Sequence, residues 1–138
     1  MTFTKSEIVN LILNYYTDSH GYWKNDVENH AEALKFIHAG FSDLNDLGDK
    51  YILNTDGQTF LGANIGNITN QFTNYLRQNN GVCFVDKVTT WFSDNFYLVD
   101  PEIIERISNY ILRNAKNRNI IITKTHLHNV GFVYELSE

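Results

Sequence analysis

Basic side chains gather in one stretch of the second half of the chain, and their chemistry is that of anion binding. Between Arg106 and His128 the sequence has five Lys and Arg residues and no Asp or Glu, a local charge of +5. Guanidinium and ammonium groups neutralise phosphates, so this stretch is a candidate contact for nucleic acid. Its charge is modest compared with that of strongly basic nucleic-acid-binding domains.

The spacing of these polar residues places four of them on one face of a predicted helix. They recur at i, i+3, i+7 and i+10, opposite an isoleucine stripe: Arg106, Asn109, Arg113 and Lys116. Glu102 shares their face. A polar outer face is also what any amphipathic helix presents to solvent, so the pattern alone leaves both interpretations open.

Histidines form a second group that could do chemistry. His126 and His128 have the i, i+2 spacing that puts two imidazoles on one side of a strand, which would be half of a metal site. No carboxylate or cysteine stands nearby in the sequence, so we expect no metal. His30 and His38 fall on the apolar stripe of another predicted helix, where we expect hydrogen-bonded core histidines.

Sequence motifs of catalysis are absent. The chain has no G-x-S-x-G elbow, no G-x-x-x-x-G-K-[ST] phosphate loop and no H-E-x-x-H pair. The glycines at 62 and 66 make no dinucleotide fingerprint, because they follow no buried strand of a βαβ unit. We therefore expect neither an enzyme nor a cofactor.

Charge is divided unevenly along the 138 residues, whose net charge is −5. Residues 1–66 have four basic and nine acidic residues, whereas residues 67–138 have seven of each. An acidic first half is repelled by phosphate, which favours a protein partner. The single Cys83 can form no internal disulfide, and neither a signal peptide nor an apolar run of about 20 residues is present. We expect a cytoplasmic protein with no membrane partner.

The basic residues need a scaffold, and apolar periodicity predicts one in the second half. The expected elements are a helix over 67–79, a strand over 82–84, helices over 86–95 and 101–116, and a closing hairpin with a strand at Phe132–Leu136. Asp100 caps the last helix and Pro101 stands in its first turn. The residues expected to face inward are Val88, Trp91, Phe92, Phe96, Ile103, Ile104, Ile107 and Ile111.

The first half begins with a predicted helix over 6–17, because Thr4 and Glu7 have the T-x-x-E form of a capping box. A second helix over 26–40 has an apolar stripe that leaves Phe36 on the polar face: Val27, Ala31, Leu34, Ile37 and Phe41. Residues 8–21 and 68–81 share five identities at an offset of 60, which suggests an internal repeat or two similar amphipathic helices.

The stretch KYILNTDGQTFL at 50–61 can be interpreted locally in two ways. Asp56-Gly57 could be a hairpin turn, or a strand could end at Leu53 with Asn54 capping a new helix. Correspondence with the hairpin at the end of the chain favours the second interpretation. We therefore expect a strand at 51–53 paired with a segment near Phe41, a short helix over 55–61, and breaks at Gly62 and Gly66.

The order of elements in the second half resembles that of the winged helix-turn-helix superfamily. The resemblance covers residues 67–137 in full and residues 6–61 as a reduced version without the middle helix, in which HAGF at 38–41 followed by YILNTDG fits a pattern common in the family. It implies an α+β, mainly helical fold of tandem winged-helix-like lobes with short β-hairpin wings. The lobes are expected at residues 1–62 and 63–138.

The resemblance also implies how the second lobe would contact DNA. In this family the helix at 101–116 enters the major groove, where Arg can contact guanine and Asn can contact adenine, and the wing touches backbone or minor groove. Arg106 and Arg113 are then expected to contact bases. The full set of implied DNA-binding residues is Arg106, Asn109, Arg113, Lys116, Arg118, Lys124, His126 and His128.

We therefore expect a small winged-helix regulator of transcription whose second lobe binds double-stranded DNA, with the first lobe as a dimerisation or partner surface. The alternative is a non-enzymatic protein-interaction module with the same fold, such as an adaptor, or an inhibitor or immunity protein of a mobile element. The net charge of −5 favours that alternative.

Overall fold

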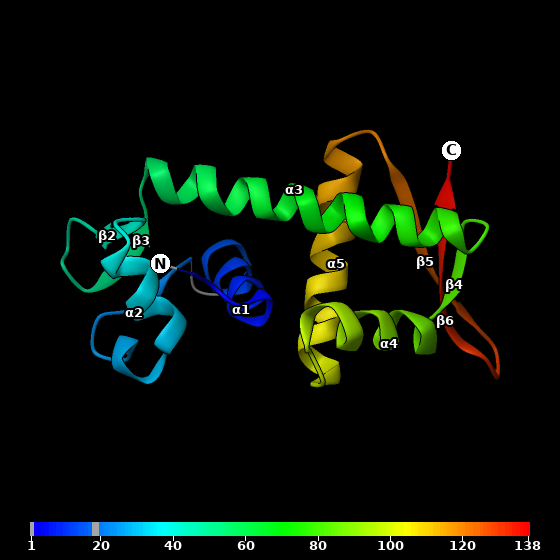
Figure 1. The fold of residues 1–138 in the computed structure, drawn as a ribbon, viewed down its shortest axis with the longest axis horizontal. Coiled ribbons are helices and arrows are strands. Elements are labelled where there is room, and N and C mark those ends of the chain that lie inside the picture. The colour runs from blue at the N-terminus through cyan, green and yellow to red at the C-terminus, as the bar shows by residue number, and fades with distance from the viewer. Residues whose placement is uncertain (1, 18–19) are drawn as a thin grey trace. The chain divides into compact units, whose positions relative to one another are not determined.

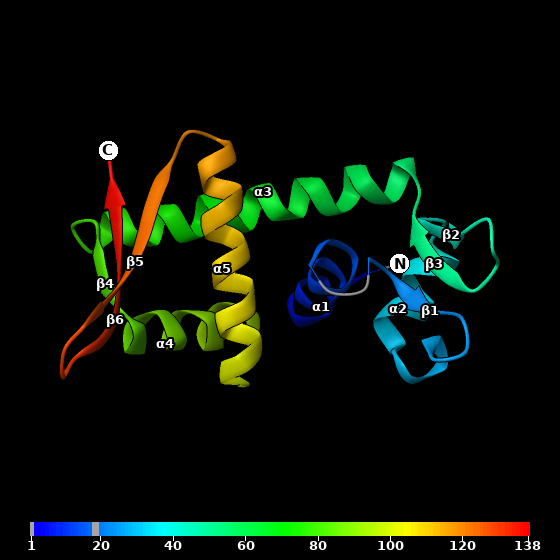
Figure 2. The same ribbon diagram turned by 180° about the vertical axis from the view of Figure 1, so that it is seen from behind.

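A computed structural model of the chain describes residues 2–17 and 20–138, which form two compact units. The first unit extends to Asn64 and the second spans Ile65–Glu138. Each combines helices with one three-stranded antiparallel sheet (Figure 1, Figure 2), which confirms the expected α+β class with short hairpins. The lobe boundary expected after Gly62 falls inside one helix, α3 (Thr55–Gln78), which contributes residues to both units.

The first unit packs two helices against a small sheet. Its elements before α3 are α1 (Lys5–Tyr16), β1 (Tyr22–Trp23), the 3₁₀ turn η1 (Val27–Asn29), α2 (Ala31–His38), β2 (Ser42–Leu44) and β3 (Lys50–Leu53). The central strand β3 pairs antiparallel with both β1 and β2. The sequence did not predict β1, because a strand of two residues has no periodicity to detect.

The helix α1 begins at the predicted capping box. Thr4 Oγ1 accepts a hydrogen bond from the backbone N–H of Glu7 at 3.1 Å, and Glu7 Oε1 accepts one from the backbone N–H of Thr4 at 2.9 Å. These two bonds satisfy donors that a helix N-terminus leaves unpaired. The prediction of this helix is confirmed.

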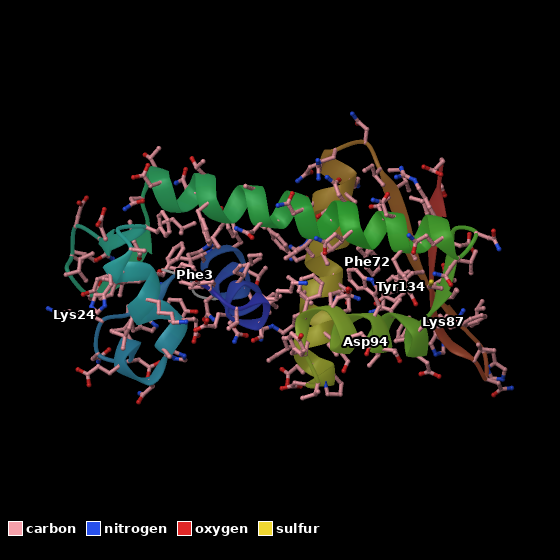
Figure 3. All side chains as sticks on the ribbon, in the orientation of Figure 1. Phe3, Lys24, Phe72, Lys87, Asp94 and Tyr134 are labelled. Carbon is pink, nitrogen blue, oxygen red and sulfur yellow. The ribbon has the colours of Figure 1, made fainter. Side chains whose placement is uncertain are left out.

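Phe36 lies at the centre of the first unit and is fully buried. Its ring centroid lies within 6.0 Å of those of four other aromatic rings: Phe3, Tyr15, Phe41 and Phe60. Figure 3 shows Phe3 pointing into this interior. The prediction that Phe36 projects from a polar face is therefore wrong.

The cause of this error is a break in the predicted helix over 26–40. His30 has extended backbone angles, φ −128° and ψ 98°, and separates η1 from α2. A stripe that starts at Val27 therefore cannot be continued in phase into α2. The buried residues of α2 are Ala33 and Phe36, one turn apart.

The hairpin β2–β3 resolves the two interpretations of KYILNTDGQTFL. Ser42 pairs with Leu53 and Asp43 with Ile52, so the turn falls within 45–49. Asn54 Oδ1 accepts a hydrogen bond from the backbone N–H of Gly57 at 2.9 Å, as a helix cap does. The expected strand and the expected cap are both confirmed.

The helix α3 is continuous over 24 residues, so the expected breaks at Gly62 and Gly66 are wrong. Each glycine costs about 1 kcal/mol relative to alanine in a helix interior. Apolar residues that recur at helical spacing on both sides are buried and offset this cost: Leu61, Ile65, Ile68, Phe72 and Leu76. The two separate helices expected at 55–61 and 67–79 are therefore parts of one helix.

The second unit has the predicted order of elements after α3. They are β4 (Val82–Phe84), α4 (Val85–Phe96), α5 (Pro101–Asn117), β5 (Ile121–Leu127) and β6 (Gly131–Ser137). The strand β6 is central and pairs antiparallel with β4 and β5. The predicted strand at 132–136, the short strand at 82–84 and both helices are confirmed.

Aromatic rings from three elements form the core of the second unit. Phe72 of α3 lies 6.0 Å from Phe92 of α4 and 5.8 Å from Tyr134 of β6, measured between ring centroids (Figure 3). On α5, isoleucines 104, 107 and 111 are buried as expected, whereas Ile103 is only partly buried. Asp100 caps α5 by accepting a hydrogen bond from the backbone N–H of Glu102 at 2.9 Å.

Candidate nucleic-acid interface

The outer face of α5 presents the polar residues that the spacing predicted. Asn109, Arg113 and Lys116 are exposed, and Arg106 is partly exposed. The opposite face of the helix packs into the core through the isoleucines described above. One amide and three cations thus share one side of a well-anchored helix.

Arg113 is held on the helix surface by its neighbour Tyr110. Its guanidinium carbon lies 5.4 Å from the centroid of the Tyr110 ring, within the range of a cation–π contact. Burial raises the pKa of Tyr110, and the charge of Arg113 acts against that rise. A guanidinium that rests on a ring is partly ordered before it meets a ligand.

Charge is segregated along α5. Glu102 and Glu105 lie in its first half, whereas Arg113 and Lys116 lie in its second half. This order complements the helix macrodipole, because carboxylates stabilise a helix N-terminus and cations stabilise a C-terminus. The positive charge of the helix is therefore concentrated in its second half, with Arg106 the one cation of its first half.

Arg118 follows the end of α5 and binds the protein itself. Its Nη1 donates a hydrogen bond to the backbone oxygen of Gly66 in α3 at 3.1 Å. A hydrogen bond between α3 and α5 themselves runs from Thr69 Oγ1 to Asn114 Oδ1 at 2.9 Å. Arg118 is exposed as a residue and lies near the basic face, but its guanidinium already has one structural partner.

We expected Lys124 to face outward from the wing as a phosphate contact, but it does not. Its side chain is only 15% exposed and turns toward the helices, with Nζ 3.7 Å from Glu105 Oε1. The ammonium also lies 4.5 Å from the centroid of the Phe132 ring. The alternation of β5 explains this position, because Lys124 shares a face with the buried Ile122, two residues away.

The two wing histidines, His126 and His128, have different surroundings and do not form a common site. The ring of His126 lies against Phe132 with centroids 5.0 Å apart, whereas His128 lies in the turn after β5. Both residues are exposed. Among residues 2–17 and 20–138, no group of three His, Cys, Asp or Glu side chains could hold a metal ion.

The wing and the outer face of its sheet expose apolar side chains. Near the tip of the β5–β6 hairpin, Val130 is 55% exposed, and Leu127 and Phe132 are each 39% exposed. On the neighbouring strand β4, Phe84 is 46% and Val82 is 41% exposed. These surfaces suit an apolar contact better than a phosphate contact.

Sequence reasoning missed two residues that shape this region, Glu105 and Tyr110. Neither belongs to the face that the helical spacing selected. Glu105 contacts Lys124 of the hairpin, and Tyr110 contacts Arg113 of the same helix. The inward turn of Lys124 could have been found from its i, i+2 relation to Ile122. Its partner Glu105 could not, because that contact depends on how the hairpin packs on α5.

The histidines of the first unit do not lie on an apolar stripe, so the expectation of two core histidines is wrong. His38 is exposed, and His30 is partly exposed at the start of α2 with Nε2 3.1 Å from Asp26 Oδ2. Hydrogen bonds from Asn29 and then His30 lower the pKa of Asp26. His30 Nδ1 also lies 3.7 Å from Glu32 Oε1, which accepts a hydrogen bond from the Tyr22 hydroxyl at 3.3 Å, so the histidine belongs to a short polar chain at the start of α2.

Two further observations limit the chemistry of the chain. Cys83 is fully buried, and burial raises the pKa of its thiol, which makes it a poor nucleophile. In the part of the chain that the structure describes, each helix is too short or too polar to cross a bilayer.

The chain matches no protein-family model, and no curated protein or solved structure is significantly similar to it.

Proposed function

We propose that the chain is a small DNA-binding regulator whose second unit contacts duplex DNA through the outer face of α5, chiefly its second half. The observation that carries this proposal is the exposure of Asn109, Arg113 and Lys116 on one face of that helix. The helix also occupies the place of the recognition helix in a helix–strand–helix–helix–hairpin order, to which the winged-helix resemblance assigns the major groove.

Different residues on this face would make different kinds of contact. Arg113 and Arg106 are suited to guanine, and Asn109 to adenine, because these side chains can donate or accept two hydrogen bonds to one base edge. Lys116 and Arg118, at the end of the helix, are suited to phosphates. We assign Lys124 no phosphate contact, since its side chain is largely buried and its ammonium turns toward Glu105.

The first unit would take no part in DNA contact. It holds all of the excess acid of the chain, which repels phosphate. We propose that it serves as a dimerisation or partner surface.

The proposal is tested by titrating a fluorescently labelled duplex with the full chain over a range of salt concentrations. The variants are Arg113→Ala, Lys116→Ala and, as a control, Lys24→Ala, an exposed lysine of the first unit (Figure 3). Arg113→Ala should weaken binding by about 1–3 kcal/mol and relax preference at one base position. Lys116→Ala should weaken all sequences alike and lower the salt slope by about one.

The proposal fails if the wild type does not bind duplex at low salt. It also fails if Lys24→Ala reduces the affinity as much as the two α5 variants do. DNA would then be attracted to exposed lysines in general and not to α5.

A protein-interaction module is the second candidate function. The exposed apolar side chains of the second unit, Phe84, Val82 and Val130 among them, favour it, as does the net charge of −5. This candidate predicts no DNA binding at low salt. It also predicts that Phe84→Ser abolishes capture of a partner while leaving the unfolding transition of the chain unchanged.

A further inference from the structure

A pocket of about 160 Å³ lies inside the second unit, between α4, the first half of α5 and the inner face of the β5–β6 hairpin. Val88, Ile104 and Tyr134 give it an apolar wall. Its charged groups are Lys124 and Glu105. This side of α5 is not the one proposed above for DNA contact.

Lys124 brings an ammonium to this pocket. Its side chain is 15% exposed, and its ammonium lies 3.7 Å from a carboxylate oxygen of Glu105, which is an ion-pair distance but beyond hydrogen-bond distance. Within the described part of the chain, Lys124 Nζ donates no hydrogen bond, and its closest neighbour ring is Phe132. Among the described residues no buried side-chain nitrogen or oxygen lacks a hydrogen-bond partner, so the Lys124 ammonium reaches solvent, and its three donors can bind an acceptor that enters the pocket.

The carboxylate of Glu105 limits the kind of ligand that this pocket can bind. Its side chain is 62% exposed and only loosely paired with Lys124, so its carboxylate is free to approach a ligand. A simple anion would be attracted by Lys124 and repelled by Glu105. A ligand with one positive and one negative group next to each other would satisfy both charges.

We propose that this pocket binds a free α-amino acid with an apolar side chain. The ligand carboxylate accepts hydrogen bonds from Lys124 Nζ, and the ligand ammonium donates to the carboxylate of Glu105. The apolar side chain lies against Val88, Ile104 and Phe132. An apolar cavity of about 150 Å³ is known to hold benzene, so a side chain of about one ring fits this volume.

The test is an NMR titration of the isotopically labelled full chain with three compounds that share one ring. L-Phenylalanine has both charges, 3-phenylpropionate has only the carboxylate, and phenethylamine has only the ammonium. L-Phenylalanine should shift the amide signals of residues around the pocket and bind at least about tenfold more tightly than either analogue. Each charged contact that an analogue lacks is of the size that gives such a factor.

Variants assign the two charges separately. Lys124→Met should weaken L-phenylalanine binding by about tenfold or more, and Glu105→Gln should weaken it by a similar factor. Glu105→Gln should leave 3-phenylpropionate binding unchanged or make it tighter, because it removes a repelling charge. The control is Lys87→Met on α4, whose ammonium reaches Asn79 Oδ1 at 3.3 Å instead of the pocket (Figure 3).

Three results would overturn the proposal. The first is the absence of shifts with L-phenylalanine up to its solubility limit, and the second is shifts that lie away from the pocket. The third is 3-phenylpropionate binding as tightly as L-phenylalanine, with Glu105→Gln strengthening both. Because Glu105 is exposed, its variant remains informative even if Lys124→Met unfolds. The titration measures ligand binding alone, so its outcome is independent of the proposed DNA contact.

Discussion

At the residue scale, a short chain of hydrogen bonds ties α1 to the sheet of the first unit. Tyr15 is 4% exposed, and its hydroxyl donates to Ser42 Oγ at 2.8 Å. Ser42 Oγ in turn donates to the backbone oxygen of Ile52 at 3.0 Å. Each hydroxyl proton in this chain therefore has an acceptor, as buried hydroxyls require.

Removing the acceptor should cost more than removing the donor. Ser42→Ala leaves the buried Tyr15 hydroxyl without its partner and should lower the free energy of unfolding by about 1–3 kcal/mol. Tyr15→Phe removes the donor itself and should cost about 0.5–1.5 kcal/mol. Urea denaturation of both variants measures the difference, and a larger loss for Tyr15→Phe would contradict this hydrogen-bond order.

The same tyrosine predicts a loss of stability at high pH. Burial raises the pKa of Tyr15 to about 12, and the hydrogen bond to Ser42 only partly opposes this. Below pH 10 both the folded and the unfolded chain keep the proton, so the stabilisation is fully present. As the pH rises from 10 to 12, the unfolded chain loses its proton first and folding weakens, by about 2–3 kcal/mol for this residue.

The measurement is the urea midpoint as a function of pH for the wild type and Tyr15→Phe. The wild type should lose stability more steeply than the variant above pH 10. Equal slopes would show that the Tyr15 hydroxyl ionises in the folded chain as readily as in the unfolded chain. Burial also raises the pKa of Tyr22, which should leave part of the slope in the variant.

At the scale of elements, the unbroken course of α3 makes a prediction that separates two glycines. A methyl group at Gly62 would meet no atom within 4 Å, so Gly62→Ala should stabilise the chain by about 0.5–1 kcal/mol through helix propensity. A methyl group at Gly57 would come 2.1 Å from the backbone oxygen of Phe41. Gly57→Ala should therefore destabilise the chain by about 1–3 kcal/mol.

Thermal unfolding of the two variants checks this pair. A lower melting temperature for Gly62→Ala than for the wild type would indicate that the helix breaks at Gly62 in solution, as glycine content alone suggested. A neutral Gly57→Ala would contradict the close approach of this helix start to Phe41.

Elements that depend on local chemistry could be predicted from the sequence. Thr4, Asn54 and Asp100 cap helices where their side chains were expected to accept backbone hydrogen bonds. Elements that depend on packing could not. Phe36 was misplaced because the extended His30 breaks the helix phase, and α3 was divided because burial outweighs two glycines.

The candidate site shows the same division. The face shared by Arg113 and Lys116 follows from helical spacing, and the structure exposes both residues there. The position of Lys124 depends on the packing of the hairpin against α5, which brings its ammonium to Glu105. Strand alternation could have shown that Lys124 points inward, but not which residue it would meet.

At the scale of the whole molecule, the charge limits how strongly the chain can hold DNA. Three exposed cations lie near the end of α5: Arg113, Lys116 and Arg118. They can neutralise only a few phosphates, and the chain as a whole is acidic. With about two or three phosphate contacts, the logarithm of the binding constant should fall with the logarithm of salt concentration with a slope of about −2 to −3. A much steeper slope in anisotropy titrations would indicate that residues outside α5 make most of the contact.

The central claim is that the second half of α5 is the surface that meets duplex DNA. It is tested most directly by adding a short mixed-sequence duplex at low salt to the isotopically labelled full chain and recording amide NMR spectra. We predict that the largest changes occur at residues 109–118, with smaller ones in the β5–β6 hairpin and none centred on β1, β2 or β3. Unchanged spectra at saturating duplex, or changes centred on the sheet of the first unit, would contradict the claim.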